Sequence, residues 1–257
     1  MDLKLTGKAV LITGGSKGIG LATAEHFAQA GCRVILVARS ADDLATAKAA
    51  IVGQSKAEVE TFVADLSDSA NVDALAVKYT NIDILVNNAG AIPGGNLLDV
   101  DEATWRKAWD LKVFGYINMC RTFYALMKKR GGGVIINVTG NAALTRDPNY
   151  ICGVAGNAAL TAFSQSLGSV SPQDGIRVIS VNPGPVETER LTGLMKKRAL
   201  NKTGDAENWR KLMKPLAFGR ACAPDEIGAM IAFLSSDLCS YNSGSVVVVD
   251  GGASART

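Results

Sequence analysis

Between a short apolar run and a helical pattern near the start of the chain stands the stretch Thr13-Gly14-Gly15-Ser16-Lys17-Gly18-Ile19-Gly20. Glycines in such a turn allow unusual backbone angles and let the backbone approach a bound pyrophosphate closely. The helix that follows offers free N–H groups and the positive end of its dipole to that negative charge. A glycine cluster alone is a weak signal, but a strand, a glycine turn and a helix in this order predict a dinucleotide site.

Short runs rich in Val, Ile and Leu alternate with longer helical patterns, which is typical of βαβ units in a parallel sheet. Strands are expected at Ala9–Thr13, Arg33–Ala38, Glu58–Ala64, Ile82–Asn87, Val134–Val138, Arg177–Asn182 and Ser245–Asp250. Helices are expected at Ile19–Ala30, Asp42–Val52, Ser69–Tyr79, Glu102–Lys129, Ile151–Val170 and Pro224–Ser235. We therefore predict an α/β fold of the Rossmann type: a doubly wound, parallel, seven-stranded sheet with helices on both faces. Its ligand should lie beyond the carboxyl ends of the strands, where the sheet order reverses.

No linker, repeat or charge block divides the 257 residues, so we expect a single dinucleotide-binding domain over residues 1–257. The segment Glu187–Lys214 interrupts the alternation with mostly polar, weakly helical residues, and we interpret it as a substrate-lid insertion. Cations outnumber acids in it. This excess indicates either a solvated helix face or attraction of an anionic substrate such as a carboxylate, phosphate or coenzyme A ester.

Composition excludes several classes of function. The net charge of +3, without a stripe of basic and aromatic residues, argues against a nucleic-acid partner. No apolar run is long enough to span a membrane and no signal peptide is recognisable, so we expect a cytoplasmic protein. The five cysteines are widely spaced and His26 is the only histidine, which argues against a metal site, a disulfide or a histidine-based triad.

Several motifs resemble those of the short-chain dehydrogenase/reductase family along nearly the whole chain. The glycine turn follows that family's TGxxxGxG spacing, and Asn87-Asn88-Ala89-Gly90 matches its NNAG element. Asp65-Leu66, Asn182-Pro183-Gly184 with Thr188, Pro224-Asp225-Glu226-Ile227 and Asp250-Gly251-Gly252 match further elements. The resemblance implies cofactor contacts at Gly14, Ser16, Lys17, Gly18, Ile19, Gly20, Asp65, Leu66, Asn88, Ala89, Gly90, Pro183, Gly184, Val186 and Thr188.

The end of the second predicted strand indicates which cofactor is preferred. An acidic side chain there would accept hydrogen bonds from the ribose hydroxyls of NAD(H), but this chain has Ala38 followed by Arg39. Arg39 can bind a 2′-phosphate or stack on adenine, and Lys17 can add a second cation. The alternative is that both are surface cations of no consequence. We expect NADP(H) to be preferred over NAD(H).

Ordinary family members use an Asn, a Ser, a Tyr and a Lys for catalysis. Aligned on Gly115, on the strand end Asn137-Val138-Thr139-Gly140 and on Ala158-Ala159-Leu160, these four positions read Lys112, Gly140, Gly153 and Asn157. Glycine can neither donate a proton nor polarise a carbonyl group. The two glycines are expected to enlarge the pocket.

Other residues could supply the missing chemistry. Lys112 could stabilise an oxyanion, or it could be a solvated helix lysine. Tyr150 could reach the pocket from the loop before Gly153, or it could be an ordinary packed tyrosine. Thr139, Asn141 and Cys152 could line the same cavity.

We expect first an NADP(H)-dependent oxidoreductase acting on a carbonyl or alcohol group of a small-molecule substrate, with Lys112, Tyr150 or water delivering the proton. One alternative is a dinucleotide-binding protein without hydride transfer. Another is a non-redox reaction, such as a lyase or hydrolase step, in the remodelled pocket. The resemblance also implies a homotetramer.

Overall fold

The computed structural model describes residues 2–255, apart from the side chains of residues 197, 198, 201 and 217. The strands are β1 (Ala9–Thr13), β2 (Arg33–Ala38), β3 (Val59–Val63), β4 (Ile84–Asn87), β5 (Gly133–Val138), β6 (Ile176–Pro183) and β7 (Val246–Val249). The α-helices are α1 (Gly18–Gln29), α2 (Ala41–Gln54), α3 (Ser69–Lys78), α4 (Glu102–Trp109), α5 (Gly115–Arg130), α6 (Ala142–Thr145), α7 (Ile151–Val170), α8 (Glu189–Thr203) and α9 (Pro224–Ser235).

These strands form one parallel sheet in the order β3-β2-β1-β4-β5-β6-β7, so the predicted Rossmann-type architecture is confirmed. Thr13 pairs in register with Val37 of β2, and Val10 with Ile84 of β4. The chain first builds outward from β1 towards β3 and then builds from β4 in the opposite direction. The reversal therefore falls between β1 and β4, and the carboxyl ends of these strands are where a ligand is expected.

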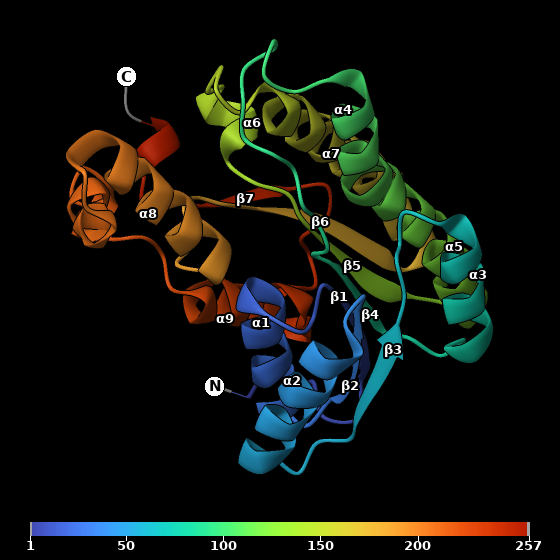
Figure 1. Ribbon diagram of the computed structural model, residues 1–257. Coiled ribbons are helices and arrows are strands. Elements are labelled where there is room, and N and C mark those ends of the chain that lie inside the picture. The colour runs from blue at the N-terminus through green and yellow to red at the C-terminus, as the bar shows by residue number, and fades with distance from the viewer. Residues whose placement is uncertain (1, 256–257) are drawn as a thin grey trace.

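Alternate residues of the central strands enter two separate cores, one on each face of the sheet. Val10 and Ile12 face the core beneath α1, α2 and α9, whereas Leu11 faces the core beneath α3 and α5. Figure 1 shows these helix layers on opposite sides of the sheet. Because both faces are covered, the central strands β1, β2 and β4 are apolar without alternation, as the sequence predicts.

Two segments differ from the sequence-based prediction. The single helix expected over Glu102–Lys129 is divided into α4 and α5 by a π-helical turn, Asp110–Phe114. The segment expected to be weakly helical contains the well-formed α8 and a 3₁₀ segment, Ala206–Met213. The Thr188 hydroxyl accepts a hydrogen bond from the Leu191 N–H and so caps the N-terminus of α8. Threonine is one of the residues favoured at this N-cap position.

Gly168 lies where α7 meets β6 and the turn before β7. A Cβ atom at this position would lie 2.3 Å from the Gly244 nitrogen and 2.7 Å from the Val178 carbonyl oxygen, both backbone atoms. By contrast, a Cβ at Gly193 in α8 would meet nothing within 4 Å.

We expect Gly168→Ala to lower the free energy of unfolding by about 1–3 kcal/mol, because the packed backbone must move apart. Gly193→Ala, the matched control, should leave it unchanged or raise it by up to about 1 kcal/mol, since alanine favours the helix. Urea denaturation of both variants measures the difference. Equal stability of the two variants would show that α7 and the β7 turn do not approach this closely.

Candidate functional site

The glycine turn after β1 is packed too closely for side chains. Gly14 and Gly18 have φ values of +63° and +53°, which L-residues rarely adopt. A Cβ on Gly20 would lie 2.1 Å from the Gly14 carbonyl oxygen. The Gly14 N–H donates to the Val37 carbonyl at 2.8 Å, which ties the turn to β2.

Thr13 and Asn88 join this turn to the loop after β4. The Thr13 hydroxyl accepts hydrogen bonds from the Asn88 and Ala89 N–H groups at 2.9 and 3.0 Å. In return, the Asn88 side-chain amide donates to the carbonyl oxygens of Thr13 and Gly14 at 3.2 and 3.1 Å. The structure therefore brings two predicted motifs together across the point where the sheet order reverses.

The residues at this edge fit a dinucleotide. The first turn of α1 contains no acidic residue, and its N-cap residue, Lys17, makes no side-chain capping hydrogen bond. The N-terminal amides of the helix are thus open to an anion. Thr188 lies over the same turn, because a Cβ on Gly18 would lie 2.9 Å from its methyl group. Loops from β1, β4 and β6 accordingly converge where a pyrophosphate is expected.

The two cations predicted to select the cofactor both face carboxylates. The Lys17 ammonium is 3.1 Å from Asp43 and 3.8 Å from Glu189. The Arg39 guanidinium is 4.0 Å from Asp65 and its side chain is 61% exposed. Exposed ion pairs at these distances are weak, so both cations remain available to a phosphate.

Lys112 lies in the π-helical turn Asp110–Phe114 and is buried, with only 7% of its surface exposed. Its Nζ atom donates hydrogen bonds to the Tyr116 hydroxyl at 2.8 Å and to the Val138 carbonyl, at the end of β5, at 2.7 Å. Its stem crosses the loop after β4, where a Cβ on Gly90 would lie 2.6 Å from its Cδ. The interpretation as a solvated helix lysine is therefore wrong.

Burial, together with the positive charge of Arg190, lowers the pKa of Lys112 from its ordinary value of 10.5 to about 7. Burial disfavours the charged form of an amine, and a nearby cation adds to this effect. The amine is thus placed to gain and lose a proton near neutral pH.

Neighbouring side chains fill the space above the two glycines, so the expected enlargement of the pocket is not found there. A Cβ on Gly153 would lie 2.1 Å from ring atoms of Tyr150, and one on Gly140 would lie 3.3 Å from the Asn157 amide. Asn157 is buried, and its Oδ1 has no hydrogen-bond partner among the described residues. The Tyr150 ring thus occupies the space that the Cβ atom of the family's tyrosine would take at position 153.

Three further side chains predicted to line the pocket contact other residues. They are Thr139, Asn141 and Cys152. The Thr139 hydroxyl is buried and contacts Ser180 and Asn182 of β6. The Asn141 amide donates to the Asp250 carboxylate at 3.3 Å. Cys152 is fully buried in an apolar cluster. The structure does not bring these three side chains together with Lys112.

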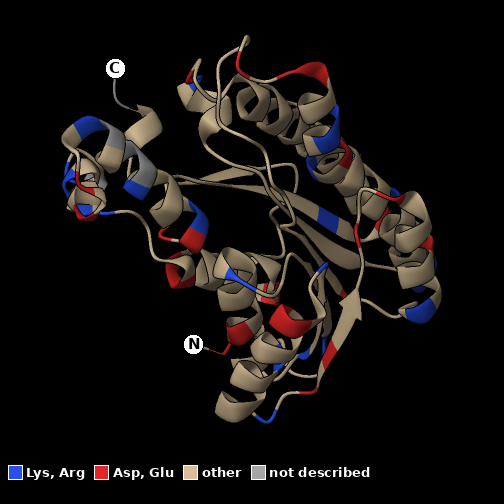
Figure 2. Cartoon of the chain, viewed as in Figure 1, with Lys and Arg blue, Asp and Glu red and all other residues tan. Residues whose placement is uncertain are grey.

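The segment 187–214, predicted to be a substrate lid, contacts the loop after β4 through Arg190, in the first turn of α8. Its guanidinium donates a hydrogen bond to the Ile92 carbonyl in the loop after β4. The Lys196 side chain pairs with Glu207, and Arg210 stacks on Trp209. Figure 2 shows the charged residues of the chain mainly on its helices and loops, with several cations on α8. The side chains of Lys197 and Arg198 lie outside the described residues.

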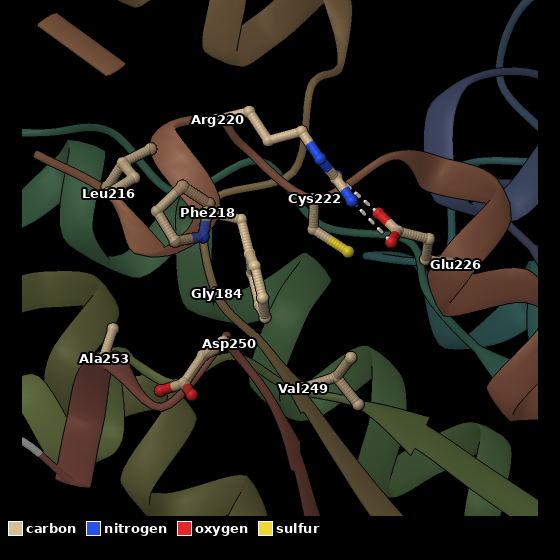
Figure 3. A pocket seen from close by; sticks show the side chains of 11 residues that line it. Gly184, Leu216, Phe218, Arg220, Cys222, Glu226, Val249, Asp250 and Ala253 are labelled. Carbon is tan, nitrogen blue, oxygen red and sulfur yellow. Dashed lines mark hydrogen bonds and ion pairs between the residues drawn. The ribbon is translucent and has the colours of Figure 1, made fainter. Parts of the chain in front are cut away.

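A separate cavity of about 140 Å³ lies beside the loop after β6, between that loop and the segment that follows the lid. Figure 3 shows the Arg220 guanidinium hydrogen-bonded twice to Glu226, with Cys222 close by. Of the predicted cofactor contacts, only Gly184 lines this cavity. The cavity therefore lies beside the β6 loop, and Lys112 does not line it.

Metal binding and membrane crossing each require a recognisable arrangement in the described part of the chain. No cluster of three or more His, Cys, Asp or Glu side chains is placed there to hold a metal ion. None of its helices combines the length and the apolar character that a membrane crossing requires.

A glycine turn at the reversal point of a parallel sheet, with loops from β4 and β6 beside it, defines a dinucleotide-binding α/β protein. The model of the family described as short chain dehydrogenase matches residues 8–199. The chain belongs to the short-chain dehydrogenase/reductase family, as the sequence motifs indicate.

Relatives match this chain over its whole length. D-threitol dehydrogenase of Mycolicibacterium smegmatis is 32% identical over 255 residues, covering 98% of this chain and 94% of that protein. The structure of L-sorbose reductase from Gluconobacter frateurii complexed with NADPH and L-sorbose has a TM-score of 0.93 at 31% identity and covers 100% of both chains. A 7α-hydroxysteroid dehydrogenase complexed with NADH and 7-oxoglycochenodeoxycholic acid has a TM-score of 0.85 at 28% identity, covering 98% of this chain and 96% of that one.

Two residues that shape the site are not predicted by the sequence motifs. Tyr116 holds the Lys112 ammonium from the next turn of the same helix, and the spacing of four residues between them could have revealed the pair. Arg190 was counted only as one of several lid cations, and nothing in the sequence separates it from the others.

Burial of Lys112 predicts a pH-dependent stability. Between pH 7 and 10.5 the unfolded chain holds a proton on this amine that the folded protein has released, so folding becomes more favourable as the pH rises. The free energy of unfolding should therefore rise with pH, relative to Lys112→Met, by at most about 1.4 kcal/mol per pH unit.

Urea denaturation of wild type and Lys112→Met at a series of pH values from 6 to 9.5 measures this difference. Lys107→Met, on the exposed side of α4, serves as the control and should show the wild-type dependence. Parallel curves for wild type and Lys112→Met would contradict the lowered pKa.

Proposed function

We propose that this protein is an NADP(H)-dependent oxidoreductase that interconverts a carbonyl and an alcohol group through a non-standard catalytic arrangement centred on Lys112. The observation that carries this proposal is the buried Lys112 amine, which is held at the end of β5 beside the NNAG loop with a pKa of about 7. A general acid works best when its pKa lies near the operating pH. Family membership supports the type of reaction.

The preference for NADP(H) rests on the end of β2. Ala38 leaves no carboxylate to repel a 2′-phosphate, and the exposed Arg39 can pair with that phosphate in place of Asp65. The related L-sorbose reductase structure contains NADPH, which agrees with this preference, whereas the hydroxysteroid dehydrogenase contains NADH. The proposed cofactor contacts are the converging motif residues of the β1, β4 and β6 loops, together with Asp65 and Leu66 after β3.

When bound, the cofactor supplies the hydride that reduces the carbonyl carbon. The Lys112 ammonium donates a proton to the carbonyl oxygen, so that the carbon gains a hydrogen, the oxygen becomes a hydroxyl and Lys112 becomes a neutral amine. Solvent then returns a proton to the amine. Tyr116 and the Val138 carbonyl hold Nζ in place throughout, because both hydrogen bonds come from rigid elements.

A second candidate function, dinucleotide binding without hydride transfer, is favoured by one observation. The ring of Tyr150 and the amide of Asn157 occupy the space above Gly153 and Gly140, which leaves less room for a substrate. Tyr150 is the alternative proton donor if a substrate enters beside its ring. The homotetramer that the family resemblance implies remains a proposal.

Cofactor choice is tested with Arg39→Ala. We expect the Kd for NADPH to rise by about 10- to 100-fold, because a charge-assisted pair to the phosphate is lost, and the Kd for NADH to change much less. Titration of bound nicotinamide fluorescence measures both constants. Arg106→Ala, which breaks only a surface pair with Glu102, is the control. Equal weakening for NADPH and NADH would show that Arg39 does not select the phosphate.

The role of Lys112 is tested by NADPH oxidation with a panel of aldehydes and ketones. We expect Lys112→Met to lower kcat/KM by about 10²- to 10⁴-fold, as is usual for loss of a general acid. Lys107→Met and Tyr150→Phe should retain activity. In wild type, carbonyl reduction should slow as the pH rises above about 7, because the ammonium form is then lost.

Full activity of Lys112→Met, with loss of activity in Tyr150→Phe, would show that Tyr150 and not Lys112 donates the proton. Tight NADPH binding without oxidation by any carbonyl compound would favour the second candidate function.

A further inference from the structure

The Lys112 ammonium has unused hydrogen-bonding capacity. A protonated amine carries three N–H groups, and the described residues accept from it only at the Tyr116 hydroxyl and the Val138 carbonyl. The Tyr116 hydroxyl accepts one of these bonds and donates its own proton to the same carbonyl at 3.0 Å, and the ammonium lies 4.4 Å from the centre of the Tyr116 ring. One N–H therefore has no hydrogen-bond partner within the described part of the protein.

No carboxylate faces this buried cation among the described residues. Three acids of the segment 187–214 and its flank form ion pairs with other cations. These pairs are Glu189 with Lys17, Glu207 with Lys196, and Glu226 with Arg220. A buried charge is normally paired, since removal from water without a counter-charge is costly.

Arg190 brings a second positive charge towards the same place. It extends from α8 to the Ile92 carbonyl in the loop after β4, and its charge lowers the pKa of Lys112. The guanidinium has five N–H donors, and one of them donates to the Ile92 carbonyl. Arg190 forms no ion pair among the described residues. Two cations from different elements thus contact the same loop, Lys112 at Gly90 and Arg190 at Ile92, and neither forms an ion pair among the described residues.

We propose that the substrate is an oxo acid, or the corresponding hydroxy acid, whose carboxylate binds Arg190 while its carbonyl or hydroxyl oxygen faces Lys112. This inference rests on the function proposed above and names its substrate class. A planar carboxylate matches the fork of a guanidinium, which can donate two parallel hydrogen bonds to it. The remaining Lys112 N–H is then the donor to the reacting oxygen.

The contacts of the two cations with one loop favour a carboxylate close to the reacting carbon. Lys112 contacts this loop at Gly90 and Arg190 contacts it at Ile92, so groups bound to the two cations would lie near one another on the same molecule. A 2-oxo acid places its carbonyl oxygen and its carboxylate on adjacent carbons. The negative charge would also raise the pKa of Lys112 and keep its proton in place until transfer.

The first test is binding and does not depend on turnover. Calorimetric titration with oxamate, a stable analogue of a 2-oxo acid, is carried out on the protein alone and on the protein saturated with NADPH. We expect measurable binding that weakens by about 10- to 100-fold in Arg190→Gln and is partly restored in Arg190→Lys. Arg210→Gln, which removes a lid arginine stacked on Trp209, should bind as wild type.

Absence of oxamate binding in wild type, or equal affinity in wild type and Arg190→Gln, would overturn the proposal. Oxamide, the neutral analogue, should bind far more weakly than oxamate. Equal affinity for the two would overturn it as well, because the carboxylate would then contribute nothing.

The second test separates this inference from the proposed function. NADPH oxidation is measured with 2-oxobutanoate, its methyl ester and butanone. We expect kcat/KM for the acid to exceed that for both neutral compounds and to fall by about 10- to 100-fold in Arg190→Gln, a clearly larger fall than for the neutral pair.

Reduction of the neutral compounds without preference for the acid would leave the oxidoreductase function standing and overturn the oxo-acid assignment. An equal fall for all three compounds in Arg190→Gln would show that Arg190 only fastens the lid to the Ile92 loop, and would also overturn it. Oxamate binding without oxidation of NADPH by any compound would remove the proposed function but keep the anion site.

Discussion

The hydrogen bonds between Thr13 and the loop after β4 join the two halves of the sheet at the edge where the ligand is expected. The Thr13 hydroxyl accepts from two backbone N–H groups, and the Asn88 amide donates back to two carbonyl oxygens. These four bonds span the reversal point, where no crossover helix lies to cover the gap. The glycine turn, the NNAG loop and therefore the stem of Lys112 all take their positions from this junction.

Burial of the Lys112 amine costs free energy of folding, which the rest of the fold offsets. A buried amine loses its hydration, which is reflected in its lowered pKa, and only two protein acceptors replace the lost water. Such an arrangement adds little to stability, so its place in the fold is more readily explained by chemistry than by packing. The neighbouring network, in which the Asn87 amide donates to Asn137 and Asn137 to Ser164, fixes the strand ends beneath it.

The architecture could be predicted closely because its signals are local. β1, β2, α7 and α9 have the bounds that apolar runs and helical periodicity indicate, since each element's pattern is contained in its own residues. The candidate site was predictable only in part. The position of Lys112 followed from its spacing to Gly115, but its burial depends on a π-helical turn that periodicity does not reveal. The ring of Tyr150 over Gly153 depends on the conformation of the preceding loop, and the reach of Arg190 depends on a long side chain crossing between elements.

The π-helical turn Asp110–Phe114 makes the site depend on the length of the helix as well as on its residues. Each residue advances an α-helix by about 100°, so an added residue in one turn rotates everything on one side of it relative to the other. Deleting a single residue between Lys112 and Tyr116 would therefore rotate one of these side chains relative to the other and direct one of them away from the end of β5. Two chains with the same residues at all the motif positions could then differ in what the turn between α4 and α5 presents to a ligand. Comparison of such chains has to count residues between the motifs before it compares the motifs themselves.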